Sequence, residues 1–273
     1  MTVTTDGYPC HAGTFDTTAE IADNCRAARR IPAATTPTLR ATDTFELHDL
    51  LCVTMNDGLP SRQERTHVIK AIFFDYDGVL TTDKTGSLTT NKHLSKMTAV
   101  EFETLRRAFA PYNQALLVGK TTHGEIWDAI CEEMHCTIDF ALLEQAFLST
   151  PANDSMFALA HRLRHDYRLG IITDNKKDRI DCLRKSQDLD SLFNPIVVSA
   201  EFGSGKDGPA VFEHALRCLE VKPEESVFID NNPENLVAPR ALGMGVIYHD
   251  DERNDVDKLA AILRDEFLVQ LGR

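Results

Sequence analysis

The sequence predicts an α/β protein in which a parallel sheet carries an inserted helical unit. From Val68 onward, short apolar runs alternate with helical patterns, as expected when crossover helices connect the strands of a parallel sheet. The connection between the first and second runs is too long for one crossover and contains several helical patterns of its own. The length of 273 residues suits one large domain or a domain with a smaller companion.

Five apolar runs are the predicted strands. Each is rich in β-branched and aromatic residues and nearly continuous, which is typical of strands covered on both faces. In chain order they are VIKAIFF (68–74), LGIIT (169–173), PIVVS (195–199), SVFID (226–230) and GVIYH (245–249). Helical patterns over 153–165, 175–186 and 209–219 precede or separate the later strands. The order of these elements predicts the α/β core.

The connection over 89–152 predicts the helical unit. Its helical patterns cover 97–110, 122–134 and 138–149, and Thr122 and Glu125 have the spacing of a capping box. The chain therefore divides into an α/β core (67–88 and 153–273) and a helical cap (89–152).

The first part of the chain, 1–66, differs from the rest. It is rich in Thr and Ala, contains prolines and offers only short apolar pieces, so we expect a poorly ordered extension. Met55 lies just before the first strand, and an alternative start site there is a second interpretation of this segment.

Composition limits the partners and the compartment. A formal net charge of -13 argues against broad binding to nucleic acid or to anionic membranes. No stretch approaches the roughly 20 apolar residues of a membrane span, and the N-terminus lacks the features of a secretory signal. The seven scattered cysteines fit reduced thiols, so we expect a cytoplasmic protein. Nothing in the sequence indicates the oligomeric state.

Polar residues stand where the predicted strands end. The first strand ends in Asp75 and Asp77, the second in Thr173, and the fourth in Asp230, while the third leads to Lys206. Because the carboxyl ends of parallel strands form the ligand crevice, carboxylates, a hydroxyl and an ammonium are predicted around one point.

Such a group suits phosphoryl transfer. One carboxylate can attack phosphorus, and a second can protonate the departing alcohol and then take a proton from water. Carboxylate and backbone oxygens suit Mg²⁺, which binds phosphate and keeps several waters. The metal and Lys206 would offset the charge on the phosphoryl oxygens.

Four segments resemble the motifs of the haloacid dehalogenase superfamily. They are DYDGVLTTD, IITDN, SAEFGSGKDGPAVFEHAL and VFIDNNPENLVAPRALGM, and the resemblance covers about residues 68–250. It is closest to members with a helical cap after the first motif, including sugar-phosphate phosphatases. The resemblance implies a Rossmann-like parallel core with an inserted cap.

The resemblance also implies roles for individual residues. Asp75 would be the nucleophile and Asp77 the acid/base, with its backbone carbonyl on the metal. Thr173, Asn175 and Lys206 would bind phosphate, and Mg²⁺ would be held by Asp75, Asp77 and Asp230. An acid at position 77 favours phosphate-ester chemistry over dehalogenation, because a departing halide needs no proton.

Four positions depart from the family pattern. Asp174 stands where Asn is frequent, so either Asn175 contacts the phosphate or Asp174 turns away from it. Asp207 replaces a frequent Pro, and Asn231 replaces a frequent second Asp, which lowers the negative charge of the site. Pro239 lies where a helix interior is expected and should kink or shorten that helix.

Other signals are weaker. The GSGK segment at 203–206 fails the spacing of a nucleotide-binding loop. Cys131, His135 and Cys136 could suggest a metal cluster, but packing within the cap is favoured because no second ligand pair follows. Lys120 could contact substrate, although a plain surface lysine is favoured.

The sequence therefore predicts a Mg²⁺-dependent phosphatase that acts on a small phosphorylated metabolite through an aspartyl phosphate at Asp75. A phosphomutase would use the same intermediate but return the phosphoryl group to a sugar. A catalytically silent binding module is the third interpretation.

Overall fold

The computed structural model describes residues 68–272, so the extension predicted over 1–66 lies outside the described residues. Within them, one sheet of five parallel strands has the order β3-β2-β1-β4-β5. The strands are β1 (Ala71–Phe74), β2 (Arg168–Thr173), β3 (Ile196–Val198), β4 (Ser226–Asp230) and β5 (Gly245–Tyr248). The predicted α/β fold with a parallel sheet is confirmed.

The register brings the ends of the central strands to one edge. Phe74, the last residue of β1, pairs with Ile171 of β2 and with Ile229 of β4. Residues that follow these three strands therefore emerge side by side, at the edge where ligands bind in parallel sheets.

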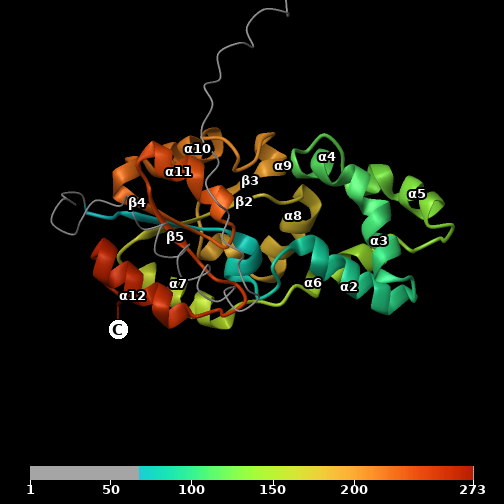
Figure 1. The fold of residues 1–273 in the computed structure, drawn as a ribbon, viewed down its shortest axis with the longest axis horizontal. Coiled ribbons are helices and arrows are strands. Elements are labelled where there is room, and N and C mark those ends of the chain that lie inside the picture. The colour runs from blue at the N-terminus through green and yellow to red at the C-terminus, as the bar shows by residue number, and fades with distance from the viewer. Residues whose placement is uncertain (1–67, 273) are drawn as a thin grey trace, which may run out of the picture. The chain divides into compact units, whose positions relative to one another are not determined.

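Apolar side chains cover both faces of the sheet. Within β1, Ile72 and Phe74 belong to one buried cluster and Ala71 and Phe73 to the other, because successive strand residues point to opposite faces. The first cluster packs against α7 (Asp154–Leu163), α8 (Lys177–Ser186) and α12 (Val256–Phe267). The second packs against α10 (Ala210–Leu219), and Figure 1 shows α10 and α12 on opposite sides of the sheet.

Short helices complete the α/β core. The segment after β3 forms α9 (Ser199–Phe202), and the segment after β4 begins with a 3₁₀ turn (Pro233–Leu236). The helix that contains Pro239 is α11 (Val237–Leu242), which has only 6 residues. This short helix agrees with the predicted effect of a proline in a helix interior.

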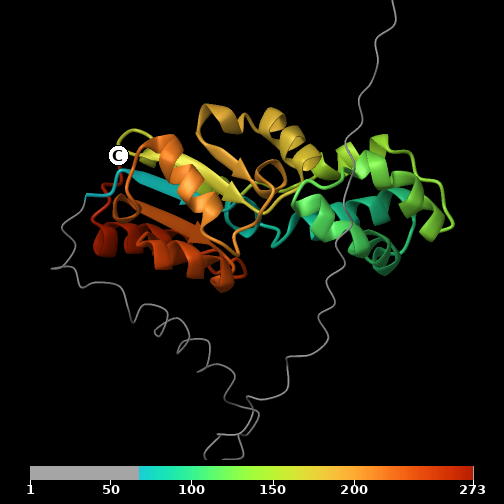
Figure 2. The same ribbon diagram turned by 90° about the horizontal axis from the view of Figure 1, so that it is seen from above.

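Five α-helices lie between β1 and α7, and we call residues 86–148, which contain them, the helical insert. They are α2 (Gly86–Thr98), α3 (Phe102–Phe109), α4 (Asn113–Leu117), α5 (His123–Glu133) and α6 (Ala141–Leu148). The strands point toward the insert (Figure 2). The insert has its own apolar cluster, which includes Leu105, Phe109 and Trp127.

The helices of the insert agree in part with the sequence patterns. The capping box of Thr122 and Glu125 is present at the start of α5. The single pattern predicted over 97–110 is instead the end of α2 and all of α3, which are separated by Ala99 in the left-handed conformation (φ 58°). The domain boundaries at 88/89 and 152/153 stay a prediction, and α2 begins slightly earlier, at Gly86.

The chain enters and leaves the insert through two adjacent segments. The Asn153 N–H donates to the Leu80 carbonyl (2.9 Å), and the Thr82 N–H donates to the Pro151 carbonyl (3.2 Å). Beyond this pair, α6 packs on α8. No helix within residues 68–272 has both the length and the apolar character needed to span a membrane.

Candidate active site

One buried ammonium joins two carboxylates at the carboxyl edge of the sheet. Lys206 Nζ lies 2.9 Å from Asp75 Oδ2 and donates a hydrogen bond to Asp230 Oδ2 at 2.6 Å. All three side chains are buried. Asp75 follows β1 and Asp230 ends β4, so the pairing of these strands places the two acids beside each other. The structure therefore brings together three of the residues that the sequence predicts for the site.

The charges of this group influence one another. Burial raises the pKa of Asp75 to about 7, although the neighbouring Lys206 opposes the effect. Burial also disfavours the charged form of Lys206, but Asp75 and Asp230 outweigh it, and the pKa of Lys206 is raised. Lys206 thus carries its positive charge at neutral pH. Because two acids face this one cation, the site can accept a second positive charge.

Hydrogen bonds fix Asp230 in addition to its ion pair. Its Oδ1 accepts from the Asn232 backbone N–H (2.7 Å), and Asn235 Nδ2 donates to Oδ2 (3.1 Å). Asn235 has no role in the sequence prediction. Its position five residues after Asp230 in the sequence, just after the strand, was the only signal for it.

Thr173 ends β2 and lines the cleft at this edge of the sheet. The residue is buried, and its hydroxyl makes no hydrogen bond with any residue that the structure describes. A hydroxyl that faces a cleft without a protein partner is open to a ligand or to water. The position is therefore suited to a phosphate oxygen.

The sequence left open whether Asp174 turns away from the phosphate or Asn175 contacts it, and both residues line the cleft. The carboxylate of Asp174 accepts the backbone N–H of Lys206 (3.1 Å), and burial raises its pKa. Asp174 thus stabilises the backbone of the loop that carries Lys206. The side chain of Asn175 is also occupied, because it bonds Asp77 and Arg179. A phosphate contact by Asn175 stays a prediction.

The carboxylate of Asp77 is bound on both oxygens by Arg179. The guanidinium donates to Oδ1 at 2.8 Å and to Oδ2 at 2.9 Å, and Asn175 Nδ2 adds a bond to Oδ2 at 3.0 Å. Arg179 is 1% exposed. The sequence prediction gave Arg179 no role. Asn175 starts a predicted helix and Arg179 lies four residues later, a spacing that places the two side chains on the same face of a helix.

Except for Asp230, which is fully buried, these residues line one cleft of about 600 Å³. The cleft adds two lysines, Lys84 and Lys176, that were not assigned from sequence, and residues of the insert form one of its walls. Asn231 also lines it and contacts the backbone at Gly78, which has a φ of 76° and no room for a Cβ atom. Lys120 is exposed and lines neither this cleft nor the smaller cavity beside it.

The described residues contain no group of three His, Cys, Asp or Glu side chains placed to hold a metal ion. Cys131 and Cys136 pack against the apolar cluster of the insert, as favoured from sequence. The carboxylate of Asp77 is engaged by Arg179, so Asp75 and Asp230 remain as a carboxylate pair among the three predicted metal ligands. This set still fits Mg²⁺, which commonly uses one or two carboxylates and completes its shell with water, phosphate or backbone oxygens.

The family model of haloacid dehalogenase-like hydrolases matches residues 69–243, which is more than half of the chain. The chain belongs to this family. The resemblance seen in the sequence motifs is thereby confirmed, and so is the prediction of a hydrolase. The roles of single residues within this haloacid dehalogenase-like hydrolase stay predictions.

Curated relatives of this haloacid dehalogenase-like hydrolase match over part of their length. Pyrophosphatase PpaX of Anoxybacillus flavithermus is 30% identical over 77 residues, which are 28% of this chain and 36% of that protein. Bifunctional epoxide hydrolase 2 of Rattus norvegicus is 25% identical over 222 residues, which are 73% of this chain and 40% of that protein. The chain thus spans 36% and 40% of the length of these two relatives.

Solved structures of family members share the fold. A predicted HAD-like family hydrolase from Porphyromonas gingivalis has a TM-score of 0.59 and 22% identity, covering 72% of this chain and 99% of that one. A HAD family enzyme from Bacteroides thetaiotaomicron, in complex with magnesium and inorganic phosphate, has a TM-score of 0.55 and 18% identity, covering 67% and 95%.

Proposed function

We propose that this hydrolase is a Mg²⁺-dependent phosphatase that cleaves a small phosphate monoester through an aspartyl phosphate on Asp75. The observation that carries the proposal is the Lys206 ammonium, which binds both Asp75 and Asp230 beside the unpartnered hydroxyl of Thr173. A nucleophilic carboxylate, a fixed cation and a free hydroxyl donor at one end of a cleft are the groups that phosphoryl transfer requires.

In the first step an oxygen of Asp75 attacks phosphorus, and the bond from phosphorus to the alcohol oxygen breaks. Asp77 gives a proton to that oxygen, so the alcohol leaves neutral. Thr173 and Lys206 hold the phosphoryl oxygens. In the second step Asp77 takes a proton from water, the water oxygen attacks phosphorus, and the bond to Asp75 breaks to release inorganic phosphate.

Asp77 must change partners before it can act in this way. Both of its oxygens are bound to Arg179 in the structure, so proton donation requires that at least one of these bonds be exchanged for a bond to substrate. Mg²⁺, held by Asp75, Asp230 and the Asp77 carbonyl, would add positive charge at the phosphoryl oxygens.

Four observations outside the carboxylate group support the proposal. A relative is named a pyrophosphatase, and a structure with the same fold holds magnesium and inorganic phosphate. Residues of the helical insert line the cleft, which suits a cap that excludes bulk water during reaction. The net charge of -13 favours a small metabolite over nucleic acid as the substrate, and the cytoplasm stays the expected compartment.

The test is phosphate release from a panel of phosphate esters by the purified full chain, with Mg²⁺ and with a chelator. Asp75→Asn should abolish release without lowering the unfolding temperature, while Asp207→Asn, at an exposed acid next to Lys206, should keep full activity. Unchanged release by Asp75→Asn would rule out the proposed nucleophile. An isomerised sugar phosphate without free phosphate would identify a phosphomutase, and a wild-type protein inactive toward every ester would favour a binding module.

A further inference from the structure

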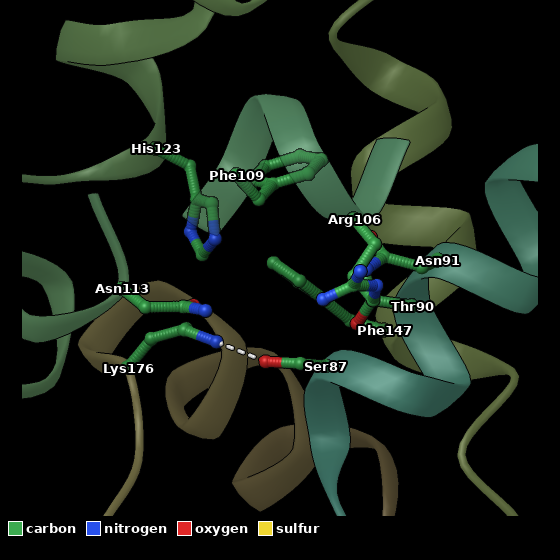
Figure 3. Close-up of a pocket in the computed structure, with 9 residues that line it drawn as sticks. All are labelled: Ser87, Thr90, Asn91, Arg106, Phe109, Asn113, His123, Phe147 and Lys176. Carbon is green, nitrogen blue, oxygen red and sulfur yellow. Dashed lines mark hydrogen bonds between the residues drawn. The ribbon is translucent and has the colours of Figure 1, made fainter. Parts of the chain in front are cut away.

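A second cavity adjoins the catalytic cleft, between the helical insert and the start of α8. Its volume is about 50 Å³, room for roughly three or four water-sized groups. Ser87, Asn113 and Lys176 line both this cavity and the catalytic cleft. The two spaces are therefore adjacent, with Lys176 in the wall of each. We call the smaller one the insert cavity (Figure 3).

The insert cavity contains a buried ammonium that lacks a counter-anion. Lys176 is 9% exposed and donates a hydrogen bond to Ser87 Oγ at 2.6 Å, but it forms no ion pair with any described carboxylate. Two acids whose charge reaches it, Asp77 and Asp178, are bound to Arg179 and to His123. A buried charge without a partner is costly, so an anion in this cavity would be strongly favoured.

The neighbouring lysine shows the contrast. Lys177 is exposed and pairs with Asp181 (2.7 Å) and Glu201 (3.1 Å), as is usual for a lysine on a helix surface. Burial and the nearby Arg179 lower the pKa of Lys176 to about 8, so Lys176 still carries its charge at neutral pH. Of these two adjacent lysines, only the buried one lacks an acid.

The other polar groups of the cavity also suit an anion. No Asp or Glu lines it. Arg106 on α3, which is exposed and also pairs with Glu103 (2.7 Å), contributes a second positive charge from the opposite side of the cavity (Figure 3). The side-chain amides of Asn91 and Asn113 make no hydrogen bond with any described residue, although Asn91 is only 5% exposed. These amides are therefore available to donate to a ligand.

We propose that the insert cavity binds a second anionic group of the substrate, a carboxylate or a further phosphate, through Lys176, Arg106 and the amides of Asn91 and Asn113. The inference rests on the proposed phosphatase function and narrows its substrate class. The scissile phosphate lies at Asp75, and the leaving group carries an acid that reaches Lys176. A neutral alcohol of the same size would leave the Lys176 charge unmatched.

The kinetic test compares 2-phosphoglycolate, pyrophosphate and 2-hydroxyethyl phosphate with the full chain and Mg²⁺. The third compound matches the first in size but has a neutral hydroxyl in place of the carboxylate. At least one anionic substrate should exceed the neutral one in kcat/KM by about 10- to 100-fold, the range expected for hydrogen bonds to a charged group. Whichever of the two is preferred identifies the anion as a carboxylate or a phosphate.

Lys176→Met keeps the length of the side chain and removes its charge. This variant should lose about 10- to 100-fold in kcat/KM for the preferred anionic substrate and little for 2-hydroxyethyl phosphate. Lys177→Met, at the adjacent exposed lysine, should behave as wild type on all three compounds. Equal losses on charged and neutral substrates in Lys176→Met, or no preference in the wild type, would overturn the proposal.

A binding measurement separates this inference from the proposed function. Calorimetry with the Asp75→Asn variant should show tighter binding of the preferred anionic compound than of 2-hydroxyethyl phosphate, and Lys176→Met added to that variant should remove the difference. If the wild type hydrolyses none of the esters, the phosphatase proposal is wrong, yet this binding difference still decides the anion site. Equal affinities for the charged and neutral compounds would refute the anion site even if hydrolysis is observed.

Discussion

Arg179 holds both carboxylate oxygens of Asp77 and also contacts the first residue of the helical insert and the segment that follows its last helix. Its Nη2 donates to Thr150 Oγ1 (3.2 Å), just after the last helix of the insert. A Cβ atom on Gly86, at the start of the insert, would lie 2.2 Å from the Arg179 Cζ atom. The guanidinium therefore fills the space between the candidate acid/base and the two segments that connect the insert to the α/β core. A displacement of the insert would change the surroundings of the bond to Asp77.

This contact makes Arg179 a positioning residue for Asp77. Arg179→Met should lower kcat by about 100-fold, because misplacement of a reacting group by about 1 Å can have an effect of that size. Arg184→Met is the matched control, since Arg184 lies on the same helix, pairs with Asp190 near the surface and contacts no residue of the site. Phosphate release under saturating substrate measures both variants.

Substrates with different leaving groups show whether Arg179→Met loses activity because Asp77 is misplaced or because the whole site is disturbed. An alkyl phosphate needs a proton for its departing alcohol, whereas p-nitrophenyl phosphate has a much better leaving group and depends less on an acid. Arg179→Met should therefore lose more activity on the alkyl ester, as Asp77→Asn should. Equal losses on the two esters would show that Arg179 does not act through Asp77.

Lys206 should contribute to stability as well as to phosphate binding. Lys206→Met leaves Asp75 and Asp230 buried without their cation, and removal of one partner from a buried ion pair typically costs about 3–5 kcal/mol. Urea unfolding of the full chain measures the loss. Lys70→Met is the control, because its ion pair with Glu225 is largely exposed on the lysine side, and exposed pairs contribute little to stability. A loss for Lys206→Met no larger than that of the control would contradict the expected role of the buried cation.

The sequence predicted the parts of the site that depend on strand order. Asp75, Thr173 and Asp230 follow adjacent parallel strands, so the pattern of apolar runs was enough to bring them to one edge. The direction of Asp174 was left open, because it depends on the backbone of the loop that carries Lys206. Local sequence patterns do not predict which loops will contact each other in the fold.

Arg179 and Lys176 were missed for a related reason. Asp77 lies 102 positions from Arg179, and Ser87 lies 89 positions from Lys176, and both contacts form where α8 meets the start of the insert. Helical periodicity predicts that each element exists but not how two elements pack. The break between α2 and α3 was missed because Ala99 adopts a left-handed conformation there, a position where Gly or Asn is the usual signal.

The anion site should depend on pH through Lys176. Because the pKa of Lys176 is lowered to about 8, its ammonium is present below that pH and is lost as pH rises above it. The kcat/KM for the preferred anionic substrate should therefore fall by up to about tenfold per pH unit above 8, since kcat/KM reports the groups of the free enzyme. Lys176→Met should lack this decline, and 2-hydroxyethyl phosphate should show little of it in the wild type. A decline shared by wild type and Lys176→Met would assign it to another group.

Gly78 is constrained by its backbone conformation and by its contact with Asn231, and two other glycines allow these two effects to be measured separately. Gly78 has a φ of 76°, and a Cβ atom there would lie 2.1 Å from Nδ2 of Asn231. Gly203 has a φ of 88° but no neighbouring heavy atom within 4 Å, and Gly208 has neither constraint. Gly78→Ala therefore measures the effects of the backbone conformation and of the close contact together. Gly203→Ala measures the effect of the backbone conformation alone, and Gly208→Ala measures neither.

We expect urea unfolding to show the largest loss of stability for Gly78→Ala, a smaller loss for Gly203→Ala and the smallest change for Gly208→Ala. Gly208→Ala should change stability by less than about 0.5 kcal/mol or stabilise slightly, because surface substitutions away from special features have small effects. Gly203→Ala should lose about 1–2 kcal/mol, the cost of a left-handed conformation for a residue with a Cβ atom. Gly78→Ala should lose more than Gly203→Ala, because Asn231 must also move out of the candidate site. If Gly78→Ala and Gly203→Ala lose the same amount, the contact between Gly78 and Asn231 does not constrain the fold.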